Sequence, residues 1–142
     1  MKIRQAVGSV VFQNNEYLLV HKVKSINGNA DIIGHWDFSK GGVEESDKDL
    51  ESAVLRELKE ETGSDKFRII SRFDKQICFT FPKGHKYDRQ ETVMFYIEYF
   101  GDREDLKPQD NEIDDIRFFN RHDLMGIINL EETREFLHEI IN

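Results

Sequence analysis

The segment GGVEESDKDLESAVLRELKEETG, residues 41–63, decides the fold because it joins a glycine turn to one long amphipathic helix. We predict that this helix covers residues 46–62. The hydroxyl of Ser46 can cap the N-terminus, and Asp47 and Asp49 suit the positive end of the helix dipole. Gly63 stands where a left-handed residue commonly ends a helix. The segment therefore predicts a tight turn followed directly by a helix.

An acidic cluster lies along the edge of the apolar face of this predicted helix. At about 100° per residue, an apolar stripe and three glutamates fall on neighbouring parts of the helix surface. The stripe is Leu50, Val54 and Leu58, and the glutamates are Glu57, Glu60 and Glu61. Half-buried like charges either raise their own pKa values or recruit a cation. Because Mg²⁺ prefers oxygen ligands, a metal site is one interpretation of the cluster.

A network of salt bridges on the helix surface is the other interpretation of the same residues. Arg56 and Glu60 are four residues apart, which is the spacing of an ion pair along a helix, and Lys59 is close to Glu57. Helix geometry alone favours neither interpretation.

Length and composition limit the classes of function that need to be considered. With 142 residues, 38% hydrophobic and 34% charged, the chain has the balance of a folded protein, and we expect one domain over residues 1–142. The net charge of -8 argues against binding duplex nucleic acid by bulk charge. The single cysteine, Cys78, lies in an apolar run and is expected to pack in the core. We see no run of 18 apolar residues and no secretory leader, so we expect a cytoplasmic protein without a membrane segment.

The pattern of the remaining segments predicts a mixed sheet with helices inserted between its strands. Residues 6–13 and 16–23 are apolar runs separated by Asn14 and Asn15, which suit a tight hairpin turn. Residues 24–42 are predicted as a long loop with a short strand at 35–38. Three further strands are predicted at 67–81, 91–101 and 112–120, and a closing amphipathic helix at 130–141. This order indicates an α/β fold, an α/β/α sandwich around a mixed β-sheet.

The helical segment resembles the signature of the Nudix (MutT-like) hydrolases, Gx5Ex7REUxEExGU, where U is aliphatic. The resemblance also extends to the order of hairpin, long loop, short strand, catalytic helix and later strands, and so covers most of the chain. It implies the Nudix fold. The matching positions are Gly41 or Gly42, Arg56, Glu57, Leu58, Glu60, Glu61 and Gly63.

The segment departs from the signature at two positions. Counting back eight residues from Arg56 reaches Lys48 instead of a glutamate, whereas counting forward six from Gly41 reaches Asp47. One extra residue between turn and helix explains both counts, and Asp47 then replaces the missing glutamate as a partner in a salt bridge or a cap. Ser64 replaces the final aliphatic residue, a change that affects packing after the helix.

The resemblance implies hydrolysis of a nucleoside diphosphate linked to another group, by attack of water on a phosphorus. By position in the signature, Gly41, Glu57, Glu60 and Glu61 become ligands of Mg²⁺, with Mn²⁺ as the alternative ion. Glu57 would also orient or deprotonate the water, and Arg56 would hold the carboxylates in place. Glu112, in a later strand, either reaches the metal site or is a solvated residue at the edge of a strand.

Substrate choice depends on the basic segment PKGHKYDRQ, residues 82–90. Lys83, Lys86 and Arg89 offer cations for phosphates and Tyr87 a ring for a base, although a solvated hairpin tip has the same composition. The run WDFSKGG, residues 36–42, is similar to the dinucleoside polyphosphate hydrolases and RNA pyrophosphohydrolases of the family, with Ser39 at their proline position. We therefore expect a small nucleotide such as a dinucleoside polyphosphate as substrate, with an RNA 5′ end also compatible.

Two other functions fit the same family resemblance. One is a nucleotide-binding regulator without turnover, which the altered residues Asp47 and Lys48 would suit. The other is a Nudix enzyme for a pyrophosphate that is not a nucleotide. Whether the protein is a monomer or a homodimer is open, since nothing in the sequence shows an interface.

Overall fold

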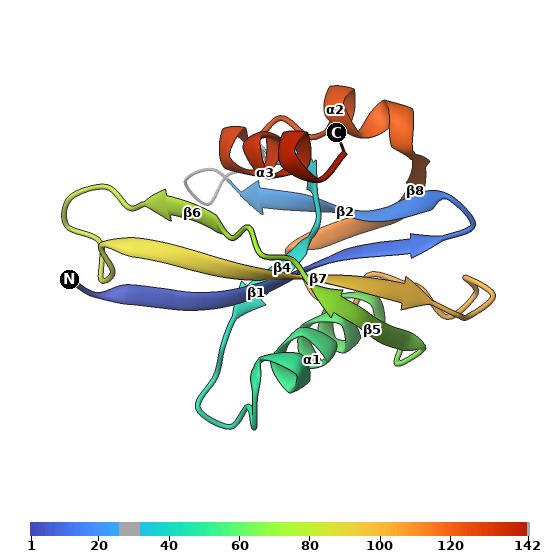
Figure 1. Cartoon of the computed structure of the whole chain (residues 1–142), viewed down its shortest axis with the longest axis horizontal. Coiled ribbons are helices and arrows are strands. Elements are labelled where there is room, and N and C mark those ends of the chain that lie inside the picture. Colours follow the sequence, from blue (N-terminus) through green and yellow to red (C-terminus); the bar gives the residue numbers. More distant parts are fainter. Residues whose placement is uncertain (26–31, 142) are drawn as a thin grey trace.

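A mixed β-sheet lies between α1 on one face and α2 and α3 on the other, as predicted (Figure 1). The computed structural model describes residues 1–25 and 32–141. Its strands are β1 (Ile3–Gln13), β2 (Glu16–Ser25), β3 (Ile32–Asp37), β4 (Ser39–Gly42), β5 (Phe67–Arg72), β6 (Ile77–Thr80), β7 (Arg89–Tyr99) and β8 (Ile113–Asn120). Its helices are α1 (Leu50–Thr62), α2 (Leu124–Ile127) and α3 (Glu131–Ile141), with a 3-10 turn at Arg121–Asp123.

Strand β1 organises the sheet. It pairs in parallel with β7 from Ile3↔Arg89 to Phe12↔Glu98, and antiparallel with β4 and β2 along its other edge. The turn between β1 and β2 places Asn14 and Asn15 at φ 51° and 68°. These angles lie in the left-handed region that asparagine tolerates. The predicted hairpin is confirmed.

The core is divided between the two faces of the sheet. On one face, Val54 and Leu58 of α1 pack with residues such as Phe95 and Ile97 of β7. On the other face, Phe136 and Leu137 of α3 pack in a second apolar cluster, whose further buried members are Val10, Leu19, Phe38, Ile77, Met94, Leu124 and Ile128. The buried apolar surface of each helix fixes that helix against the sheet.

Helix α1 begins four residues later than predicted, and its N-terminal cap is Asp49 instead of Ser46. The Asp49 carboxylate accepts a hydrogen bond from the backbone N–H of Ser52 at 2.7 Å. Asp47 is held in a turn before the helix, where its backbone N–H donates to the carbonyl of Glu44 at 2.9 Å. The end of the helix is as predicted, with Gly63 at φ 81°.

Residues 67–81 form two strands, so the prediction of one long strand is wrong. Both β5 and β6 pair antiparallel with β7, and the ladder of β5 shifts register between Ile69 and Ser71. Between the two strands, Phe73 packs edge-on against Phe136 of α3, with ring centroids 5.3 Å apart. The sequence also did not predict β4 or α2. Part of the predicted loop at 24–42, residues 26–31, lies outside the described residues.

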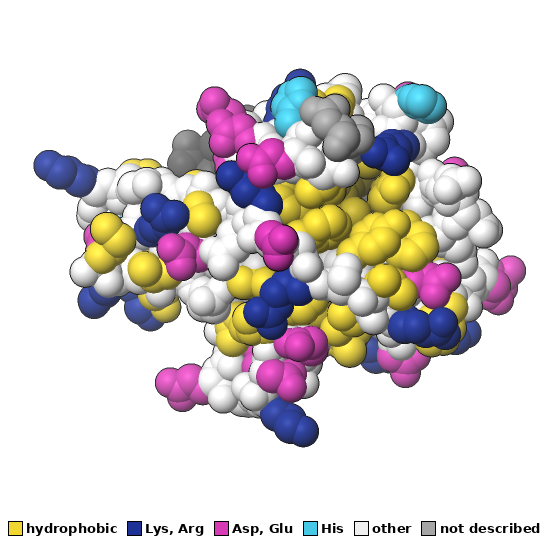
Figure 2. Space-filling model, in the orientation of Figure 1, with side chains coloured by type: hydrophobic (Ala, Val, Ile, Leu, Met, Phe, Trp, Pro, Cys, Tyr) yellow, Lys and Arg dark blue, Asp and Glu magenta, His cyan; other side chains and the backbone are white. Residues whose placement is uncertain are grey.

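The face of the sheet that carries α2 and α3 is only partly covered. Figure 2 shows hydrophobic side chains gathered in the middle of this face, below the helices. A small apolar cavity of about 180 Å³ lies here, lined by Val10, Tyr17, Phe73, Tyr96, Arg121, Leu124, Leu137 and Ile140. Among the described helices, none is both long and apolar enough to span a membrane.

Candidate active site

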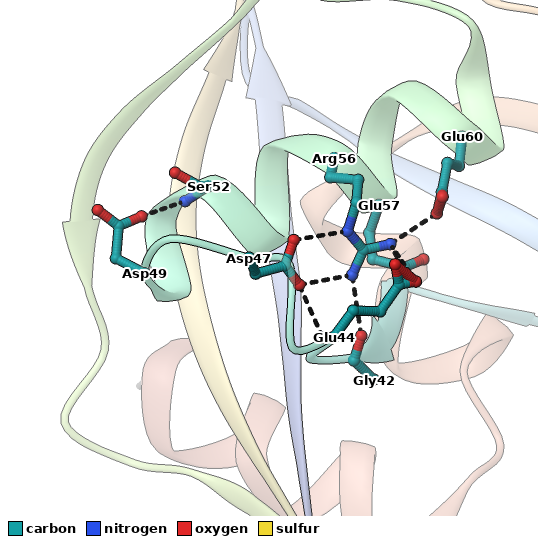
Figure 3. A network of polar contacts seen from close by, with 8 residues as sticks. All are labelled: Gly42, Glu44, Asp47, Asp49, Ser52, Arg56, Glu57 and Glu60. Carbon is teal, nitrogen blue, oxygen red and sulfur yellow. Dashed lines mark hydrogen bonds and ion pairs between the residues drawn. The ribbon is translucent and has the colours of Figure 1, made fainter.

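Arg56, in the middle of α1, is the centre of a polar network that joins this helix to the segment before it (Figure 3). Its guanidinium donates two hydrogen bonds to Asp47, at 2.8 and 2.9 Å, and one to the carbonyl of Gly42 at 3.0 Å. It also donates to the carboxylates of Glu60 at 2.7 Å and Glu57 at 3.2 Å. The hydrogen bonds to Asp47 are the main cause of a raised pKa of Arg56 and also lower the pKa of Asp47. Arg56 thus ties Gly42, at the end of β4, to the glutamates of the helix, and the predicted glycine turn is a strand end in the structure.

The carboxylate of Glu57 lies directly against Gly41. A Cβ atom placed on Gly41 would lie 2.0 Å from Cδ of Glu57, a distance that no packed side chain tolerates. Glu57 is half-buried, and its burial raises the pKa of the carboxyl group although Arg56 opposes the shift. A glycine, which has no Cβ, is therefore required here to leave room for the glutamate.

Glu61 is the most buried acid of the helix, with 7% of the residue exposed. The hydroxyl of Ser39, on β4, donates a hydrogen bond to its Oε1. Burial raises the pKa of Glu61 to about 7, against the opposing charge of Lys22 and the hydrogen bond from Ser39. A divalent cation beside this carboxyl group would favour its charged form.

Glu57, Glu60 and Glu61 line one cavity of about 440 Å³, which also contains Gly41. Two further acids from the segment before β8, Asp110 and Glu112, reach the same cavity. Four side chains that carry a positive charge, or gain one when protonated, also line the cavity: Arg4, Lys22, His35 and Lys40. The cavity therefore combines carboxylates with cations, as a site for a metal ion and a phosphate chain would require.

Lys40 is the most firmly held cation of the cavity. Its ammonium lies 3.0 Å from the buried carboxylate of Asp37 and donates to the hydroxyl of Thr133, on α3, at 2.6 Å. Burial lowers the pKa of Lys40, and Asp37 opposes that shift. Lys22 is 3.6 Å from the same carboxylate. These contacts link helix α3 to β4, the strand that contains Gly41 and Gly42.

The carboxylates offer the hard oxygen donors that Mg²⁺ requires, together with the carbonyl of Gly41. Within residues 1–25 and 32–141, no three His, Cys, Asp or Glu side chains are gathered closely enough to form a finished metal cluster. Glu60 is instead engaged by Arg56, and Glu61 by Ser39. The carboxylate oxygens that line the cavity are donors of the type that fits a divalent cation.

The predicted substrate-binding residues lie in different places. Lys86 and Tyr87 line a second cavity, next to the first and sharing Glu112 with it. Lys83 is exposed in the turn of the β6–β7 hairpin. Arg89 pairs with Glu91 at 3.1 Å. Because strand side chains alternate, Arg89 points away from the face on which Gln90 lines both cavities.

Sequence reasoning did not assign a site role to Arg4, Lys22, Asp37 or Lys40. Lys22 interrupts an apolar strand, and Lys40 directly precedes the glycine pair, so both left a local signal. Arg4 and Asp37 carried no local signal. The pairing of β1 with the distant β7 brings Arg4 to the cavity, and the pairing of β2 with β3 brings Asp37 beside Lys22.

Comparison with known proteins agrees with the fold and with the pattern of the helix. The chain is 33% identical over 109 residues to a protein of Nitratiruptor sp. named RNA pyrophosphohydrolase, covering 72% of this chain and 70% of that protein. A protein of the same name from Wolbachia sp. subsp. Brugia malayi is 29% identical over 112 residues, covering 74% of this chain and 65% of that protein.

Solved structures share the fold at low sequence identity. The MutT protein from Methanosarcina mazei Go1 superimposes with a TM-score of 0.74 at 20% identity, over 97% of this chain and 92% of that chain. An Ap4A hydrolase of C. elegans gives a TM-score of 0.69 at 20% identity, over 96% of this chain and 94% of that chain. The NUDIX domain family matches residues 2–141. With this match added to the glutamate helix and its glycine turn, the chain belongs to the family of Nudix hydrolases.

Proposed function

We propose that this Nudix hydrolase cleaves a pyrophosphate linkage in a nucleotide and that it requires Mg²⁺. The observation that carries the proposal is the composition of one cavity. Glu57, Glu60 and Glu61 line it together with Lys22 and Lys40. Carboxylates alone would repel a phosphate chain, and lysines alone would not bind a divalent cation. A metal-bound polyphosphate satisfies both sets of charges.

Gly41, Glu57, Glu60 and Glu61 are the residues that would hold the ion. When bound, Mg²⁺ neutralises phosphate oxygens and makes the attacking water more acidic. Arg56 keeps the turn and the helix in register through Asp47 and Gly42, so that the glutamates share one orientation.

Glu57 is the proposed general base. Its carboxylate is half-buried and lines the cavity, where it can accept a proton from a water held beside the ion. The proton moves to a carboxylate oxygen of Glu57 as the water oxygen attacks one phosphorus of the linkage. The bond from that phosphorus to the bridging oxygen breaks, and the bridging oxygen leaves with the other phosphate. Lys22 and Lys40 face the negative oxygens of the chain, and Glu112 is a second candidate for orienting the water.

The substrate we propose is a nucleotide with a polyphosphate, either a dinucleoside polyphosphate or the triphosphate at an RNA 5′ end. The relatives named RNA pyrophosphohydrolase support the second of these. Lys86 and Tyr87 are the proposed contacts beyond the phosphates, because they line the adjacent cavity. That Lys83 and Arg89 contact the substrate remains a prediction.

The test is turnover of a substrate panel by the purified protein, with and without Mg²⁺. The panel contains nucleoside di- and triphosphates, dinucleoside polyphosphates and 5′-triphosphorylated RNA. We expect hydrolysis of at least one member that needs the metal and that falls at least about 100-fold in Glu57→Gln. Glu51→Gln is the matched control, since Glu51 is an exposed glutamate of the same helix that pairs with Arg72. Full activity in Glu57→Gln, Glu60→Gln and Glu61→Gln would reject the site.

A further inference from the structure

A second cavity extends the catalytic cavity toward the β6–β7 hairpin. It has a volume of about 780 Å³, and three of its lining residues, Arg4, Gln90 and Glu112, are shared with the catalytic cavity. Arg4 is fixed at the junction by a hydrogen bond to Gln90. A ligand that lies in the first cavity can therefore continue into the second. The second cavity is lined by Arg4, Phe81, His85, Lys86, Tyr87, Gln90 and Glu112.

Aromatic rings follow one another along this hairpin. The rings of Phe81 and His85 are stacked, with centroids 3.9 Å apart and planes 5° apart. Phe79 meets Phe81 edge-on at 4.9 Å, and Tyr87 lies 6.4 Å from His85. The row thus leads from Phe79, which lines the catalytic cavity, to Tyr87 in the second cavity.

The hairpin holds its rings in place before any ligand binds. The backbone N–H of Phe81 donates to the carbonyl of Asp88 at 2.9 Å, and that of Tyr87 donates to Nδ1 of His85 at 3.0 Å. Gly84 provides the left-handed residue of the turn at φ 89°. His85 is exposed even though its neighbours fix it, so a flat π-surface is presented to solvent. Such preorganisation lowers the entropy cost of binding a rigid ring.

We propose that the rings of His85 and Tyr87 form a platform for the nucleobase of the substrate, with the ammonium of Lys86 beside it. This inference rests on the proposed function, and it identifies the group attached to the phosphates as a nucleoside. The ammonium of Lys86 lies 5.5 Å from the centre of the Tyr87 ring. The attraction between this cation and one face of the ring helps to hold Tyr87 in place. Every nucleobase can stack on an aromatic side chain. The platform therefore favours a nucleobase over other groups but does not distinguish one base from another.

Binding of a fluorescent base tests the platform without turnover. The probe is 2-aminopurine riboside 5′-triphosphate, whose emission is quenched when the base stacks, added to the Glu57→Gln variant with Mg²⁺. We expect saturable quenching, with a Kd that rises about 5- to 150-fold in Tyr87→Leu and in His85→Leu, the range of base–aromatic stacking. Tyr87→Phe keeps the ring and should keep the quenching. Phe100→Leu is the matched control, an exposed ring 51% accessible on another part of the surface.

The outcomes separate the platform from the proposed function. Hydrolysis of the panel without any quenching, or quenching that Tyr87→Leu and His85→Leu leave unchanged, would overturn the platform and leave the hydrolase proposal standing. Quenching without hydrolysis would overturn the hydrolase proposal and leave the platform standing. A second arm uses a short RNA with a 5′-triphosphorylated 2-aminopurine. Quenching of the free nucleotide or of the RNA supports the platform, and the tighter of the two identifies the source of the base.

A second inference concerns two buried serines beneath the metal site. Ser9 and Ser39 are cross-strand partners of β1 and β4, and both are at most 2% exposed. Ser39 donates to Glu61, whereas the hydroxyl of Ser9 has no hydrogen-bond partner among the described residues. Ser39 also stands at the position of a proline in the related sequence pattern, and a proline has no hydroxyl to donate.

The structure assigns Ser39 as a positioning residue that holds the carboxylate of Glu61 for the metal ion. This assignment rests on the proposed metal site. A ligand carboxylate fixed by a hydrogen bond binds metal more tightly than a free one, and loss of such a bond costs about 10- to 100-fold in affinity. The unpartnered hydroxyl of Ser9 should contribute nothing of this kind.

Titration calorimetry with Mn²⁺ or Mg²⁺ tests the role of Ser39. We expect Ser39→Ala to weaken the metal Kd at least about 10-fold, Ser39→Thr to restore most of it, and Ser9→Ala, the matched control, to keep it. Equal Kd values in Ser39→Ala and in the unmodified protein would overturn the role and leave the metal site intact. If the unmodified protein binds no divalent cation, that result would overturn both the proposed metal site and the proposed role of Ser39. Thermal melting confirms that each variant is folded.

Discussion

Asp47 accepts two hydrogen bonds from Arg56, at 2.8 Å from Nε to Oδ1 and at 2.9 Å from Nη2 to Oδ2. The two residues are nine positions apart, and the pair closes the turn onto the helix. Planar, two-pronged contacts of this kind fix orientation as well as charge. Of the two roles predicted for Asp47, a salt bridge or a cap, the structure contains the salt bridge, whereas Asp49 caps the helix.

Removing the charge of Asp47 should impair catalysis more than stability. In Asp47→Asn the guanidinium loses its strongest partner, so we expect the activity to fall about 10- to 100-fold, as for other groups that orient metal ligands. Asp49→Asn removes the same charge two residues away, but asparagine caps a helix as well as aspartate does. Steady-state rates of both variants with the best substrate of the panel make the comparison. Equal rates would show that Asp47 has no orienting role.

Adding one methyl group at Gly41 should weaken metal binding. The new Cβ would lie 2.0 Å from Cδ of Glu57, so the Glu57 side chain must move. In Gly42→Ala the nearest atom is Nη2 of Arg4 at 2.5 Å, the end of a flexible side chain that can give way. We expect Gly41→Ala to weaken the Mn²⁺ Kd at least about 10-fold and Gly42→Ala to weaken it less. Calorimetry gives both values, and the reverse order would contradict the packing at Gly41.

The metal-free protein should lose stability as the pH rises from about 4.5 to about 7. The folded-state pKa of Glu61 is raised to about 7, so in this interval the folded chain binds more protons than the unfolded chain, and the free energy of unfolding falls with pH. The effect of one such group is on the order of 3 kcal/mol. Melting in EDTA should give a lower Tm at pH 8 than at pH 5.5. Glu61→Gln should flatten this difference, and a slope unchanged in the variant would assign it to other groups.

Helix α3 should influence substrate binding through Thr133. Thr133→Val keeps the shape of the side chain but removes its hydroxyl. Lys40 then loses its 2.6 Å hydrogen bond and retains its ion pair with Asp37. We expect a loss of about 1 kcal/mol in the free energy of unfolding and a higher KM, because the ammonium is less well fixed toward the phosphates. Thr133→Ser retains the hydroxyl and is the control. Denaturant unfolding and KM are measured on both, and a KM that is equal in the two variants would remove Thr133 from the site.

The catalytic helix was predictable because its signals are local. The apolar stripe, the terminal Gly63 and the arginine–glutamate spacing all lie within one stretch of sequence, and the structure contains the helix they predict. The predicted start of the helix was wrong because three closely spaced residues, Ser46, Asp47 and Asp49, are all good N-terminal caps. Arg56 occupies the carboxylate of Asp47, a tertiary contact that no capping preference reveals.

The basic residues of the cavity were not predictable in the same way. Lys22 lies on β2, and its approach to Asp37 depends on the pairing of β2 with β3, whereas Lys40 follows Asp37 by three residues. The break between β5 and β6 was also missed, since residues 67–81 have a strand-like composition throughout. At the break, Phe73 packs against Phe136 of α3, a contact that no local pattern predicts.

The parallel ladder of β1 with β7 joins residues 86 positions apart, as in the pair Ile3↔Arg89. During synthesis, β1 leaves the ribosome long before its partner does, and contacts of such wide separation form slowly. Phe95 and Ile97 of β7 belong to the core that receives α1, so this helix lacks a complete docking surface until β7 has emerged. A nascent chain that stops before β7 holds the three glutamates of the helix without the sheet that organises them.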